Sequence, residues 1–147
     1  MAEKRYLLMS IKPVYAQKIK AKEKTIELRS SSPKVSPGDI LVTYESSPIQ
    51  RITAYCEIGS IISMTPKKLW EVVKDKAGIA QDAFEEYFSG KQEGVGICLK
   101  NVNVLSLPKP LSVIAEGFSA PQSYRYISEE QFQRLVSAGI SSEIKNH

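Results

Sequence analysis

The stretch SIKPVYAQKIKAKEKTIELR, from Ser10 to Arg29, combines two kinds of hydrophobic spacing with a dense set of charges. It begins at the end of an apolar run, Tyr6–Ile11, which predicts a central strand. Pro13 suits the first position of a helix, so we expect a short helix over residues 14–21. Residues 25–29 then alternate between apolar and polar, which predicts a second strand. A strand, a helix and a strand in this order place the charged residues at one end of the fold.

The second predicted strand carries a cluster of side chains that could bind a ligand or transfer a proton. Alternation turns Thr25, Glu27 and Arg29 to one side, Lys24 stands at the mouth of the strand, and Lys12 ends the strand before it. Arg29 could bind a phosphate with two parallel hydrogen bonds, and Glu27 could accept hydrogen bonds from a base edge. A desolvated Lys24 could carry a proton. The alternative from periodicity alone is a surface pair of Glu27 and Arg29 beside a solvated Lys24.

The charge of the chain is concentrated in its first third. Residues 1–36 hold nine lysines and arginines against three glutamates, whereas the rest holds 11 basic and 13 acidic residues. A basic end on a near-neutral body suggests a local contact with phosphate or another anion. The alternative is a solvated lysine face, because the predicted helix turns Tyr15 and Ile19 toward the core and spreads Lys18, Lys20 and Lys22 outward.

The rest of the sequence predicts strands separated by short helices. Further strands are expected over residues 39–44, 51–64 and 94–107, the second of them either continuous or bent near Gly59. Helices are expected after Thr65 and across residues 80–89. A last helix is expected to begin at a capping box at Ser128 and to end at Gly139. Residues 111–126 are expected to be irregular. This order predicts an α+β or mixed-barrel fold rather than regular β-α-β alternation.

Several classes of site and compartment are disfavoured. The single histidine is His147, so neither a histidine-based nucleophile nor a histidine metal site is expected, and we expect no metal or cofactor. Cys56 and Cys98 are the only cysteines, which does not suggest a disulfide framework. No apolar run approaches the ~20 residues that cross a bilayer, so we expect a cytoplasmic protein with no membrane contact.

The runs Ser10–Ile19 and Lys24–Arg29 resemble the opening of the ASCH (activating signal cointegrator homology) family. In that family a short strand and a helix precede a G-x-K-x-x-x-x-R signature. Lys24 stands at the signature lysine and Arg29 at the signature arginine, whereas Lys22 stands in the place of the glycine. Two later segments also resemble family segments, namely residues 42–48 and, in some prokaryotic members, residues 120–126.

The resemblance implies a PUA-like mixed β-barrel with short peripheral helices and a C-terminal helix, an α+β fold. It covers roughly residues 6–107, so we predict a barrel domain over residues 1–107 and a C-terminal extension, residues 108–147, that packs on the same domain. Such proteins place a cleft beside the first helix and line it with the signature lysine and arginine.

The function that the resemblance implies is nucleic-acid binding, with RNA or a nucleotide-like ligand as the partner. In this hypothesis Lys12, Lys24 and Arg29 hold phosphate and Glu27 reads a base or ribose. Further binding residues are predicted in a turn and near the C-terminus, where an aromatic ring and an arginine could stack on a base. These are Ser46, Ser47, Tyr124 and Arg125.

Two other functions remain open. One is an enzyme, either a ribonuclease or a hydrolase of acylated nucleosides, with Lys24 as proton carrier and Glu27 as base. One ASCH branch is similar to amidohydrolases that deacetylate N4-acetylcytidine with Lys, Thr and Glu, and Glu27 occupies the position of the threonine. The other is a transcription-related adaptor that binds a protein partner through the C-terminal helix around Phe132.

Overall fold

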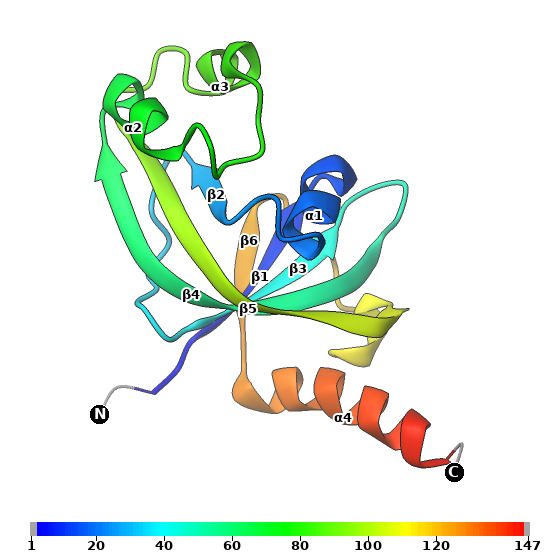
Figure 1. The fold of residues 1–147 in the computed structure, drawn as a ribbon. Helices are drawn as coiled ribbons and strands as arrows, with labels where there is room; N and C mark the ends of the chain where they lie inside the picture. The colour runs from blue at the N-terminus through cyan, green and yellow to red at the C-terminus, as the bar shows by residue number, and fades with distance from the viewer. Residues whose placement is uncertain (1–2, 146–147) are drawn as a thin grey trace.

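The fold is a six-stranded mixed sheet curled into a half-barrel, with helices on both of its faces (Figure 1). The computed structural model describes residues 3–145 and the side chains of residues 3–137. The order of strands across the sheet is β2-β5-β4-β3-β1-β6. The strands are β1 (Tyr6–Ile11), β2 (Ile26–Arg29), β3 (Ile40–Glu45), β4 (Arg51–Met64), β5 (Gly94–Lys109) and β6 (Tyr124–Ile127). The predicted α+β class is confirmed, and the expected mixed β-barrel takes the form of a half-barrel.

β1 is an interior strand of the sheet, next to the edge strand β6, and is buried on both faces. It pairs in parallel with β3 and antiparallel with β6, and the chain between β1 and β3 contains α1 (Pro13–Lys20) and β2. Alternate side chains of β1 enter two different cores, with Leu7 and Met9 on one face and Leu8 on the other. This explains why the run is continuously apolar rather than alternating.

The curvature of the sheet comes from its two longest strands. β4 has 14 residues and β5 has 16, and their antiparallel register shifts at three places, including the stretch between Ile58 and Ile61. Such irregularities bend a strand and increase its twist. The segment around Gly59 is therefore one long, bent strand. Near its start, from Val95 to Cys98, β5 pairs with β2.

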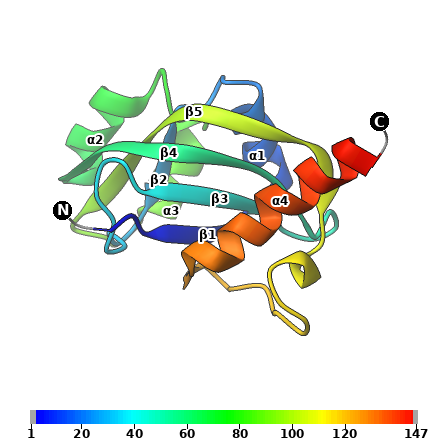
Figure 2. The same ribbon diagram turned by 90° about the horizontal axis from the view of Figure 1, so that it is seen from below.

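The helices divide the molecule into three apolar cores. α1 packs with Ile19 on the inner face of the half-barrel, whereas α4 (Glu129–Lys145) lies on the opposite face and buries Phe132 and Leu135 there (Figure 2). α2 (Pro66–Val73) and α3 (Gln81–Tyr87) form a third core against β2 (Figure 1). A 3-10 turn at Leu111–Val113 completes the structure.

Two expectations about the C-terminal region were wrong. Residues 124–127 form β6 instead of an irregular segment, because β1 offers them a backbone edge that a four-residue pattern does not reveal. The last helix begins as predicted, with Ser128 Oγ accepting from Gln131 N at 3.0 Å and Gln131 Oε1 accepting from Ser128 N at 2.9 Å. It continues past Gly139, however, because one glycine costs a helix only about 1 kcal/mol.

Within residues 3–145, no helix combines the length and the apolar character that a membrane span requires.

Candidate nucleic-acid interface

A cavity of about 600 Å³ opens above β2, between α1 and α3, and we call it the β2 cavity. Five residues that the sequence singled out line it together. They come from the ends of β1 and β3 and from β2 itself, and they are Lys12, Lys24, Glu27, Arg29 and Ser46. The strand alternation predicted for residues 25–29 therefore does bring the charged side chains to one place, although Thr25 is exposed and does not line the cavity.

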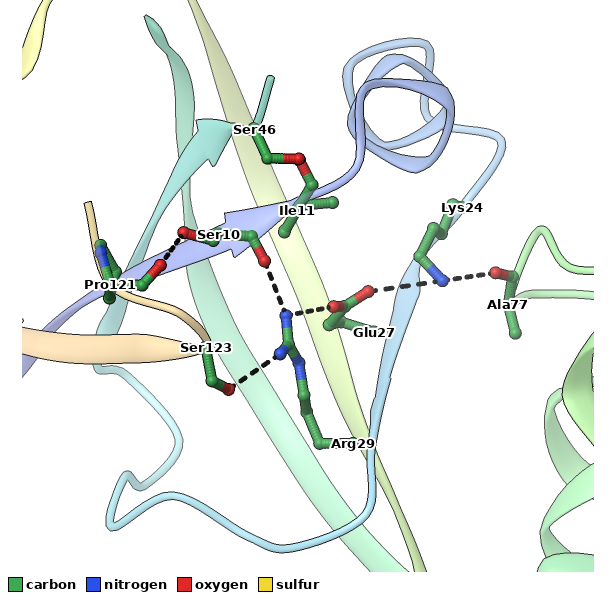
Figure 3. A network of polar contacts seen from close by, with 9 residues as sticks. All are labelled: Ser10, Ile11, Lys24, Glu27, Arg29, Ser46, Ala77, Pro121 and Ser123. Atoms are coloured by element: carbon green, nitrogen blue, oxygen red, sulfur yellow. Dashed lines mark hydrogen bonds and ion pairs between the residues drawn. The ribbon is translucent and has the colours of Figure 1, made fainter. Parts of the chain in front are cut away.

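Glu27 is the centre of a buried ion cluster (Figure 3). Its Oε2 lies 2.9 Å from an Arg29 terminal nitrogen, and its Oε1 lies 3.5 Å from Lys24 Nζ. The side chains of Lys24 and Glu27 are only 3% and 9% exposed. Two cations thus lie on either side of one carboxylate, in a place largely removed from solvent. The alternative of a surface pair beside a solvated Lys24 does not hold, because Lys24 and Glu27 are buried and Arg29 is only 16% exposed.

Arg29 links three segments of the chain (Figure 3). One terminal nitrogen donates to Ser123 Oγ at 3.1 Å, just before β6, and the other donates to the Ser10 carbonyl at 3.1 Å, in β1. The second nitrogen also donates to Glu27 at 2.9 Å. Because both terminal nitrogens are occupied, Arg29 holds Glu27 in place and ties strand edges together. The remaining donor, Arg29 Nε, is buried without a hydrogen-bond partner.

Lys24 is buried by the segment that carries α2 and α3. Its Nζ donates to the Ala77 carbonyl and lies 5.3 Å from the centroid of the Tyr15 ring. Burial lowers the pKa of Lys24 below its ordinary value of 10.5, and the carboxylate of Glu27 partly opposes that shift. Because burial disfavours the charged form, keeping Lys24 protonated lowers the free energy of unfolding.

This cost predicts how stability depends on pH. Because the pKa of Lys24 is lower in the folded chain, the unfolded chain binds more protons at any pH between the two pKa values. Raising the pH toward 10.5 across that window should therefore stabilise the wild type relative to Lys24→Met, which has no such proton. Urea unfolding of both proteins at a series of pH values measures the difference, and a constant or falling difference would contradict it.

Three of the predicted binding residues lie outside the β2 cavity. Ser47 is exposed in the turn after β3, and Tyr124 packs against the core on the inner face of the sheet. The Arg125 guanidinium stacks on the Phe118 ring at 3.9 Å from its centroid. Tyr124 and Arg125 were predicted as binding residues because residues 124–127 were not recognised as the strand β6.

The sequence missed the opposite side of the cavity. There Ala83, Glu86 and Tyr87 of α3 line the space, and Gln122 lines it beside β6. Tyr15, predicted to face the core, is half-buried and lines it from α1. Tyr87 is the last residue of α3 and is 45% exposed, a setting that suits an aromatic side chain with a polar tip.

Another hollow, of about 620 Å³, lies between residues 3–6 and the junction of β6 with α4. Its charged lining side chains are all exposed, and they are Glu3, Lys4, Arg5, Lys34 and Glu129. Exposed charges of both signs are ordinary solvated surface, so the β2 cavity, with its buried ions, is the stronger candidate. In residues 3–145 no group of three or more His, Cys, Asp or Glu residues is placed to hold a metal ion.

The chain is similar to known proteins in sequence and in fold. The ASCH domain family matches residues 9–110. The ASCH domain-containing ribonuclease of Zymomonas mobilis is 22% identical over 146 residues, which are 97% of each chain. The crystal structure of ASCH from Zymomonas mobilis is similar with a TM-score of 0.86 over 92% of this chain and 96% of that one, at 22% identity. The N-terminal domain of Staphylothermus marinus McrB has a TM-score of 0.62 at 11% identity, over 92% and 95% of the two chains.

Proposed function

This chain belongs to the ASCH domain family, and from that premise we propose that it binds RNA through the β2 cavity. The observation that carries the proposal is the buried triad of Lys24, Glu27 and Arg29 at the base of a cavity whose rim holds the exposed Lys12. The charged side chains that line the cavity are three cations and two carboxylates, so the space favours an anion. The ribonuclease among its relatives is named for acting on RNA, which supports RNA as the nucleic acid.

The roles of the residues follow from their exposure. Lys12 is exposed and is free to contact a phosphate, whereas Lys24 is buried, Arg29 is half-buried, and both add a fixed positive potential below it. Glu27 is held by both and has acceptor positions left for a base or ribose hydroxyl. Ser46 Oγ sits near the Ile11 carbonyl at 3.4 Å and offers a neutral contact at the rim.

The salt dependence of binding tests this proposal. A short fluorescein-labelled single-stranded RNA of mixed sequence should bind with an affinity that falls as salt rises, because phosphate contacts release counterions. Lys12→Ala should weaken binding and reduce the slope of log affinity against log salt by about 0.7, the value for one phosphate contact on a single strand. Fluorescence anisotropy measures both quantities.

The matched control is Lys68→Ala, which removes an exposed lysine that does not line the β2 cavity. It should leave the slope unchanged. Absence of RNA binding by the wild type, or equal slopes for Lys12→Ala and the wild type, would contradict the proposal.

Cleavage of RNA is a second candidate function, favoured by the ribonuclease that matches 97% of this chain. Lys24 and Glu27 are the groups that we would assign to proton transfer, as the sequence suggested. Both are already engaged in the buried triad, which is why binding is the first proposal. Incubation of the labelled RNA with wild type and with Lys24→Met, followed by gel electrophoresis, separates the two, since cleavage lost in Lys24→Met would support the enzyme.

Partner and compartment complete the proposal. A protein partner at α4 stays a prediction, and in the described part of that helix Phe132 and Leu135 are already buried against the sheet. A cytoplasmic location is supported by Cys56 and Cys98, which are both free thiols, as is usual in reducing compartments.

A further inference from the structure

Tyr87 presents an aromatic ring to the β2 cavity. The residue lines the cavity and is 45% exposed, which is unusual for a large hydrophobic side chain of this molecule. Its ring contacts the Phe88 ring edge-on, with the centroids 4.8 Å apart and the planes at 80°. The contact restricts the ring on one side and leaves the rest of it accessible. An exposed tyrosine in this setting is a platform on which a flat ligand can stack.

A second tyrosine lines the same cavity from another helix. Tyr15 of α1 is half-buried, and Lys24 Nζ lies 5.3 Å from its ring centroid. That distance is within the range of a cation–π contact, so the ring is held against the ion cluster. Two aromatic rings from α1 and α3 therefore border one space whose base is charged.

The side of the cavity that carries Tyr87 is fixed to the half-barrel. We call residues 66–87, which contain α2 and α3, the α2–α3 wall. The carbonyls of residues 76–78 accept hydrogen bonds from the Thr25 backbone N–H at 2.8 Å, from Lys24 Nζ, and from Lys18 Nζ at 2.9 Å. The wall is thus positioned before any ligand arrives, which reduces the entropy lost on binding.

We propose that the β2 cavity takes one unpaired nucleobase of a single-stranded RNA, with Tyr87 as the ring on which that base stacks. The inference rests on the proposed function and adds to it the class of RNA and the residue that selects it. A volume of about 600 Å³ suits a single small ligand group. Double-stranded RNA is instead recognised across its wide, shallow minor groove, without extruding a base. Tyrosine loses little conformational freedom when it stacks, because it has two side-chain torsions.

The test is a comparison of Tyr87 variants against matched RNAs. Anisotropy is measured with the labelled single strand, with the same strand annealed to its complement, and with a strand of equal charge that carries abasic ribose sites. Tyr87→Ala should weaken binding to the single strand about tenfold, within the range for one base stacked on an aromatic ring. Tyr87→Phe should retain binding. The tenfold loss should disappear against the abasic strand, since no base remains to stack.

The matched control is Tyr126→Ala, because Tyr126 is 44% exposed and lies outside the β2 cavity. It should leave affinity for the single strand unchanged, and thermal unfolding should show that all variants are folded. Full affinity in Tyr87→Ala, while the wild type binds RNA, overturns this inference and leaves the proposed function standing. Equal losses on the base-containing and abasic strands also overturn it. If the wild type binds none of the RNAs, the proposed function and the inference both fail.

Discussion

Glu27→Gln should lower the free energy of unfolding by about 3 kcal/mol, because removing one partner of a buried ion pair leaves the other charge uncompensated. The substitution keeps the shape of the side chain and removes only its charge. Lys24, whose side chain is 3% exposed, then loses the carboxylate that lies 3.5 Å from its Nζ, and Arg29 loses a bond of 2.9 Å. Urea unfolding followed by circular dichroism measures the change.

Two further variants separate charge from shape. Glu71→Gln breaks the pair with Lys74, in which both side chains are well exposed, and should cost less than about 1 kcal/mol. Adding Lys24→Met to Glu27→Gln should recover part of the lost stability, because it removes the buried charge that Glu27 balanced. Strictly additive losses in the double variant would show that the pair is not energetically coupled.

Phe84→Ala should cost about 3–5 kcal/mol, the usual effect of deleting a buried phenylalanine side chain. Phe84 is 2% exposed, and its ring lies 4.9 Å from the Trp70 ring and 4.7 Å from the Phe88 ring between centroids. The deletion opens a cavity at the centre of the α2–α3 wall. Trp70 is the only tryptophan, so its fluorescence emission should shift to the red as water enters.

Val72→Ala is the control within the same wall, because Val72 is 49% exposed. It should change stability by no more than about 0.5 kcal/mol and leave the Trp70 emission in place. A small loss in Phe84→Ala together with an unshifted emission would show that the α2–α3 wall is not a packed unit. Since the wall carries Tyr87, Phe84→Ala should also weaken binding of the single strand.

The elements predicted best are those that a local sequence pattern identifies. Continuous apolarity identified β1, alternation identified β2, and the capping box at Ser128 located the start of α4. In each case the spacing of side chains in sequence reproduces their spacing in space. The same spacing correctly gathered Lys24, Glu27 and Arg29, because β2 turns Glu27 and Arg29 toward the mouth where Lys24 lies.

Contacts between distant segments were not predictable in this way. Tyr87 and Tyr15 border one cavity although 72 positions separate them, and nothing in either local pattern records that. β6 exists because the edge of β1 is available, and Arg29 finds Ser123 only once β6 has been placed. The burial of Lys24 likewise depends on a wall that begins 42 residues later. The rest of the site is therefore a property of the tertiary fold.

The bonds that Arg29 makes join the half-barrel across its open side. In a closed barrel the girth is set by strand number and backbone register, neither of which changes without unfolding. Here the edge strand β2 is joined across the opening to Ser10 and Ser123 by a single guanidinium. Side-chain hydrogen bonds, rather than a backbone ladder, thus span the gap between these strands, and a substitution at Arg29 would open the half-barrel at this place without breaking any pairing within the sheet.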